Sequence, residues 1–125
     1  MKKTTEIKKR PLASPSHEIS LKIPSSYTIS PEILEKVKGV TNEDVSDTVA
    51  LLKALSDPIR VRILKALHIE DLCVCVLVEL MNCEYSKLSY HLGVLKKVGL
   101  IECTQDGTFL IYRLTELGAK KVNVL

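Results

Sequence analysis

Two cysteines separated by one valine give this chain its clearest potential for metal or redox chemistry. Cys73 and Cys75 lie in the apolar stretch DLCVCVLVEL, residues 71–80. Thiolates are soft ligands that suit As(III), Cd(II), Zn(II) or Cu(I), and a thiol pair can also sense oxidation. Cys83 is the candidate third ligand or disulfide partner. Free cysteines are also common core residues, and the Leu and Val neighbours here fit that alternative too.

The local structure of this stretch decides whether the two thiols can meet. Asp71 as a helix N-cap predicts Cys73 and Cys75 at the second and fourth positions of a short helix that ends near Met81. A buried strand is the alternative, because periodicity cannot decide over so few residues. On a regular helix, residues two apart point about 200° away from each other. A helical pair would therefore have to distort its helix to share one ion.

A second group of candidate residues lies on a segment with helical periodicity, residues 85–98. Leu88, Leu92 and Leu95 predict one buried face, and Gly99 is the expected stop. The hydroxyl and Lys side chains of this helix suit contacts with phosphates or base edges of DNA, although a solvated helix face is the alternative. These candidates for DNA contact are Tyr85, Ser86, Lys87, Ser89, Tyr90 and Lys96.

The elements that position these residues follow from capping signals and periodicity. Ser30 and Pro31 begin a helix, and Thr41 with Asp44 resembles a capping box. A β-hairpin is predicted around Asp106-Gly107. The expected order is helices over 31–39, from 41 to 55, from 58 to 67, over 71–81 and over 85–98, then the hairpin, then a helix after 115. The fold class is therefore mostly α with a small β-hairpin, arranged as a winged helix-turn-helix.

The tip of the predicted hairpin is a further candidate for DNA contact. Gln105 and Thr108 flank its turn. The tip carries no Lys or Arg, which predicts modest nonspecific affinity for DNA. The alternative is that this wing does not bind DNA at all.

Composition and charge narrow the class of protein. The chain has 125 residues, enough for one compact domain, and three His without paired carboxylates give no basis for an enzyme. Residues 1–30 hold six Lys or Arg against two Glu, which predicts a basic flexible arm before a domain over 31–125. No apolar run suits a membrane span or signal peptide, so we expect no membrane partner and a cytoplasmic location with reduced thiols.

Four segments in order resemble the ArsR/SmtB family of metal- and stress-responsive repressors over roughly residues 45–118. They are LLKALSDPIRVRILKAL, DLCVCVLVELM, SKLSYHLGVLKKVGLIE and DGTFLIYRLTELG. The resemblance implies a homodimer that binds a palindromic operator in double-stranded DNA and leaves it when an inducer binds elsewhere. Cys73 and Cys75 fall where arsenic- and cadmium-sensing members carry inducer thiolates. His91 becomes a further candidate for DNA contact.

The same resemblance implies a dimer interface on the second helix and the closing helix. Val49, Leu52 and Leu55 are the residues expected there, although packing in the core explains their spacing as well.

The sequence also departs from the family pattern. Val78 stands where arsenic sites often add a third Cys, and Val76 stands where metal-sensing members often carry Asp. The closing segment TELGAKKVNVL lacks the His and carboxylates of the family's C-terminal zinc site. The inducer is thus As(III), Cd(II) or Zn(II) at the thiol pair, or there is none. The alternatives are a thiol redox regulator and a winged-helix module that binds a protein.

Overall fold

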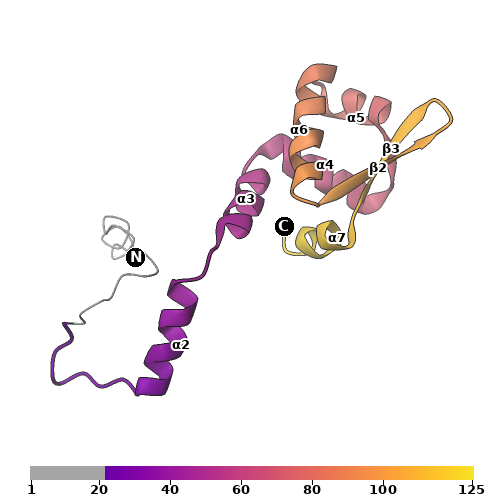
Figure 1. The fold of residues 1–125 in the computed structure, drawn as a ribbon. Coiled ribbons are helices and arrows are strands. Elements are labelled where there is room, and N and C mark those ends of the chain that lie inside the picture. Colours follow the sequence, from indigo (N-terminus) through magenta and orange to yellow (C-terminus); the bar gives the residue numbers. More distant parts are fainter. Residues whose placement is uncertain (1–21) are drawn as a thin grey trace. The chain divides into compact units, whose positions relative to one another are not determined.

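The computed structural model describes residues 22–125 (Figure 1), which are divided into two compact units, one ending at Val45 and the other beginning at Ser46. The first described unit holds one helix and the second holds the remaining elements. The elements are α2 (Pro31–Thr41), α3 (Ser46–Leu55), α4 (Pro58–Ile69), β1 (Leu72–Cys73), α5 (Val74–Met81), α6 (Tyr85–Lys97), β2 (Ile101–Asp106), β3 (Phe109–Leu114) and α7 (Glu116–Val122). Most of the predicted arm, residues 1–21, lies outside the described residues, so the predicted domain limits stay a prediction.

Helix α2 begins as the sequence predicts and ends later. The Ser30 hydroxyl accepts the Ile33 N–H at 3.2 Å, and Pro31 follows at the first helical position. The helix continues past Gly39, because an interior glycine weakens a helix by about 1 kcal/mol without ending it. Thr41 is therefore its last residue, and the prediction that Thr41 begins the next helix is wrong.

The core of the second unit is made largely of leucines, and its buried residues come from five helices and from the start of β2. Helix α4 is fixed at its start by Asp57, whose Oδ1 accepts the N–H groups of Ile59 at 2.8 Å and Arg60 at 3.2 Å. This confirms Pro58 as the first residue of the helix. The buried apolar residues are Ala54, Ile63, Leu64, Leu67, Leu77, Leu88, Leu92, Leu95, Leu100, Ile101 and Val122.

A small antiparallel sheet completes the second unit, with strand order β1-β3-β2. Strands β2 and β3 form the predicted hairpin, and Gly107 adopts the positive φ of 65° that its tight turn requires. Strand β1 adds two residues on the other side of β3, pairing Cys73 with Ile111. The architecture is the predicted one, mostly helical with a β-hairpin wing, and the short third strand lies in the stretch 71–80, where a buried strand was the alternative to a helix.

Within residues 22–125, each helix is too short or too polar to pass through a lipid bilayer.

Candidate nucleic-acid interface and thiol site

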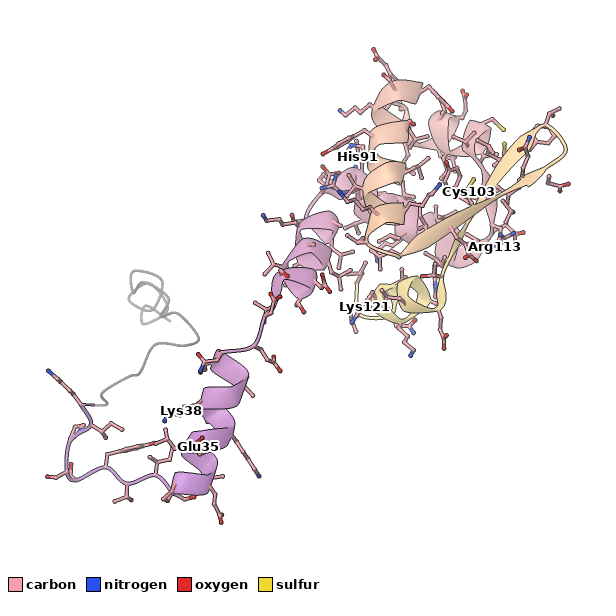
Figure 2. All side chains as sticks on the ribbon, in the orientation of Figure 1. Glu35, Lys38, His91, Cys103, Arg113 and Lys121 are labelled. Carbon is pink, nitrogen blue, oxygen red and sulfur yellow. The ribbon has the colours of Figure 1, made fainter. Side chains whose placement is uncertain are left out.

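Helix α6 presents the polar face that the sequence predicts. Leu88, Leu92 and Leu95 point into the core, and Gly99 ends the helix with a φ of 81°. Tyr90 keeps 63% of its surface exposed, on a side of the helix that the core does not cover. The other predicted contact residues of this helix are exposed too: Tyr85, Ser86, Lys87, Ser89 and Lys96. Helix α6 therefore offers hydroxyl and ammonium groups to a partner from one continuous element (Figure 2).

His91 is the exception, because its side chain is buried with only 5% of its surface exposed. The Nη1 group of Arg60 lies 3.2 Å from its Nδ1 atom, and Asp57 Oδ1 lies 4.0 Å away. This burial argues against a DNA contact by His91, which stays a prediction. Its position on α6 directs the side chain of His91 toward α4, where Arg60 donates a hydrogen bond to it.

The wing carries its predicted residues at an exposed tip. Gln105 and Thr108 are exposed, and Gln105 Nε2 donates to the carbonyl oxygen of Gly107 at 3.2 Å. The one cation of the hairpin, Arg113, lies at its base instead. Its guanidinium donates to Asp71 Oδ2 at 3.2 Å and to Thr104 Oγ1 at 3.1 Å. The wing thus reaches outward without a free positive charge at its tip.

The thiol pair lies at the junction of β1 and α5. Cys73 is the last residue of β1 and the N-cap of α5, with extended backbone angles of φ −70° and ψ 147°. Cys75 is the second helical residue, and its N–H donates to Cys73 Sγ at 3.4 Å. The two Sγ atoms lie 2.6 Å apart. The prediction of a helix from Asp71 with divergent thiols is therefore wrong, because only Cys75 is helical.

The contact between the two thiols separates their acidities. The hydrogen bond from Cys75, followed by its backbone N–H, lowers the pKa of Cys73 below the usual 9.0. The same hydrogen bond, followed by burial and the charge on Cys73, raises the pKa of Cys75. Cys73 is therefore the more acidic thiol of the pair and Cys75 the less acidic one.

The remaining two cysteines lie elsewhere in the unit. Cys83 precedes α6 and packs partly against the core. Cys103 pairs across the hairpin with Tyr112, whose pKa rises to about 12 through burial and a hydrogen bond with Cys103. Over residues 22–125, no three His, Cys, Asp or Glu side chains gather into a metal-binding group. That Cys83 joins the pair as a third ligand stays a prediction.

The predicted dimer residues divide between two environments. Leu52 is 59% exposed and Val49 is exposed beside it on α3, whereas Leu55 packs partly against the core. Two of the three residues are therefore available to a partner.

Arg60 is the residue that sequence analysis missed. Its Nε donates to the carbonyl oxygen of Ala54 at 2.7 Å and its Nη2 to that of Lys53 at 3.3 Å, while Nη1 reaches His91. Its place three residues after the N-cap Asp57 is the only local signal, and nothing in the sequence around Arg60 points to α6.

The chain is similar to known bacterial regulatory proteins. The profile of the family described as bacterial regulatory protein, arsR family, matches residues 57–102, from the N-cap of α4 to the start of β2. The cadmium resistance transcriptional regulatory protein CadC of Listeria innocua is 34% identical over 74 residues, which are 58% of this chain and 62% of CadC. The chain thus spans less than two thirds of that relative's length.

Two further relatives are covered more fully. The uncharacterized HTH-type transcriptional regulator MJ1325 of Methanocaldococcus jannaschii is 30% identical over 64% of this chain and 91% of its own length. The structure of the transcriptional repressor BigR from Xylella fastidiosa superposes with a TM-score of 0.58 and 31% identity, over 77% of this chain and 89% of BigR.

Proposed function

Because the chain belongs to the ArsR family of bacterial regulatory proteins, we propose that it is a DNA-binding transcriptional repressor in the cytoplasm. It binds a palindromic operator as a homodimer and leaves the operator when a thiophilic metal or metalloid is held by Cys73 and Cys75. The family is one of regulators and not of enzymes. The observation that carries the proposal is the exposed polar face of α6, presented beside a β-hairpin wing.

The DNA-binding role rests on what α6 exposes. A helix of this fold enters the major groove, where hydroxyl groups reach base edges or phosphates. Ser89 and Tyr90 supply hydroxyls on the exposed side, and Lys87 and Lys96 neutralise phosphates. The wing, with Gln105 and Thr108 at its tip, then contributes position rather than charge.

The dimer rests on the outward side of α3. Val49 and Leu52 leave apolar surface exposed on one helix. Two copies related by a two-fold axis bury that surface and place two α6 helices on successive half-sites of a palindrome.

The inducer site rests on the convergence of two soft donors. The Sγ atoms of Cys73 and Cys75 lie 2.6 Å apart at the start of α5, so both side chains would reach one soft ion once they separate to make room for it. The similarity to a cadmium resistance regulator favours Cd(II) among these ions. A bound ion would be held by the sulfur atoms of Cys73 and Cys75, with release of the thiol protons to solvent, and β1 and α5 would fix where these sulfurs lie.

The test is operator binding measured by fluorescence anisotropy on DNA from upstream of the gene. Arsenite, cadmium or zinc is added to wild type, to Cys73→Ser/Cys75→Ser, and to the matched controls Cys83→Ser and Cys103→Ser. We expect the double variant to bind DNA like wild type and to resist release, while both controls are released. Equal release of the double variant would show that the pair is not the sensor.

A thiol redox regulator is the second candidate, favoured by the short distance between Cys73 and Cys75 and by the lowered pKa of Cys73. Hydrogen peroxide would then form a disulfide between them, with loss of two hydrogens per chain and formation of water. Release by peroxide and not by metals, with that mass change, would favour this candidate. Absence of binding to any upstream DNA would instead point to a protein-binding module.

A further inference from the structure

His91 is the only buried polar or charged side chain among residues 22–125. It lies on α6, next to the exposed Tyr90 and within the helix that presents the candidate DNA contacts. The rings of Tyr90 and His91 meet edge to face, with centroids 5.4 Å apart. A buried titratable ring thus touches a side chain that faces the proposed operator.

The guanidinium of Arg60 joins His91 to the helices behind it. It donates to the carbonyl groups of Lys53 and Ala54 at the end of α3, and the Lys53 carbonyl also accepts the N–H of Ser56 at 3.2 Å and its hydroxyl at 3.0 Å. Its third contact is His91 Nδ1 at 3.2 Å. Arginine has only donors and stays protonated, so Nδ1 must be the acceptor and His91 must be neutral with its proton on Nε2.

We propose that Arg60 and His91 form a proton-sensitive positioning link that sets α6 against α3 and α4, so that operator binding requires neutral His91. The inference rests on the proposed operator binding by α6. A proton on Nδ1 removes the acceptor from Arg60 and places two positive groups in contact. The protonated Nδ1 of His91 would then face Asp57 Oδ1, an acceptor 4.0 Å away. Helix α6 then loses the hydrogen bond to Arg60 that connects it to the end of α3.

The charges around His91 define the pH window. Burial lowers the pKa of His91 below its usual 6.5, Asp57 opposes this, and Arg60 and Lys87 add to it. Burial would raise the pKa of Asp57, but the N–H groups of Arg60 and Ile59 and the charges of His91 and Arg60 bring it below 3.8. Asp57 therefore stays charged while His91 titrates.

The sign of the effect follows from this lowered pKa. Above the usual value, His91 is neutral in both the folded and the unfolded chain, and the link is complete. As the pH falls below 6.5 toward the lower folded pKa, the unfolded chain takes up the proton first. Stability falls over this range, and the link itself is lost when the pH drops below the folded pKa and His91 takes up the proton.

Operator affinity at about pH 7.5 and about pH 5.5 tests the link. Wild type should weaken on acidification by less than about tenfold, because the pKa of His91 lies below 6.5 and only part of the protein is protonated. His91→Asn places an amide oxygen near the Nδ1 position and does not titrate, so it should bind at the higher pH and change less than about twofold. His91→Leu, which lacks the acceptor, should bind weakly at both values. His68→Asn, at an exposed histidine of α4, is the matched control and should behave as wild type.

The direction of the change in operator affinity distinguishes this link from a direct charge effect. A proton on an exposed histidine would strengthen the attraction to DNA phosphates instead of weakening binding. Thermal melts at both pH values establish that each variant is folded. An identical pH profile in wild type and His91→Asn overturns the link, as does a wild type that does not weaken. Amide NMR shifts of α6 on acidification, present in wild type and absent in His91→Asn, test the link without DNA. A chain that binds no operator at the higher pH but shows these shifts contradicts the proposed function alone.

Discussion

Tyr90 and His91 are neighbours in the sequence and occupy opposite environments on α6. One is largely exposed and the other is buried. Successive residues on a helix are rotated by about 100°, so one step along the chain separates a surface contact from a core contact. At the scale of single residues, polarity therefore identifies a candidate for DNA contact only together with its position on the helix.

Replacing Ser89 and Tyr90 by alanine should weaken specific operator binding by about 1–3 kcal/mol, because each loses a hydroxyl on the exposed side of α6. Anisotropy titration at fixed salt measures the change. His68→Ala removes a polar ring from the exposed surface of α4 and is the control. A double variant that folds, dimerises and binds with wild-type affinity would show that another face reads the DNA.

Residues whose environment is local could be predicted from the sequence, and those fixed by distant partners could not. Ser30 and Asp57 cap helices through N–H groups within three residues, so their patterns are readable. Cys73 is drawn out of α5 by pairing with Ile111 in β3, and His91 is buried against Arg60 from another helix. Neither partner leaves a signal near the residue that it positions.

At the scale of elements, α7 depends on a close approach to the start of β2. Thr115 donates its N–H to the carbonyl of Leu100 at 3.0 Å and its hydroxyl to that of Gly99 at 2.6 Å. Its Oγ1 also accepts the N–H of Gly118 at 3.0 Å. A Cβ atom at Gly118 would overlap the carbonyl oxygen of Leu100. Only glycine lets the helix lie this near.

Gly118→Ala should therefore lower the free energy of unfolding by about 1–3 kcal/mol or more, since the backbone of Leu100 cannot move aside without breaking the Thr115 contacts. Urea denaturation measures it. The matched control is Gly93→Ala on α6, where nothing lies within 4 Å of the added Cβ. That variant should gain about 0.5–1 kcal/mol from helix propensity. Equal effects of the two changes would contradict the close approach.

For the whole molecule, two properties bear on operator binding: the association of two copies and the distribution of charge. The second unit exposes Val49 and Leu52 on α3, an apolar surface that a second copy can cover. The net charge of residues 31–125 is −1, so a positive potential must come from local groups or from the N-terminal segment.

Leu52→Glu should dissociate the dimer without unfolding the chain, because it places a charge where apolar surface would be buried. Sedimentation equilibrium gives the mass, and operator affinity should fall with it, since two half-sites need two copies. Ile69→Glu, another exposed apolar residue at the end of α4, is the control and should leave the mass unchanged. A dimeric Leu52→Glu would place the interface elsewhere.

Removing residues 1–27 should reduce the salt dependence of operator binding, because that segment carries six Lys or Arg against two Glu. The slope of the logarithm of affinity against the logarithm of salt concentration measures the loss. Thermal stability should stay near that of the full chain, since the second unit, which holds the core, begins at Ser46. An unchanged slope would show that the arm does not contact phosphates.

Strand β1 should open locally more easily than the rest of the sheet. Its ladder to β3 holds two residue pairs, against six in the hairpin, and one ion pair between Arg113 and Asp71 reinforces it. So short a ladder opens through local fluctuation at a small fraction of the global unfolding free energy. Amide hydrogens of Leu72 and Cys73 should then exchange with solvent well before those of β2. Transient fraying of this strand would let Cys73 leave Ile111 while the wing keeps its shape.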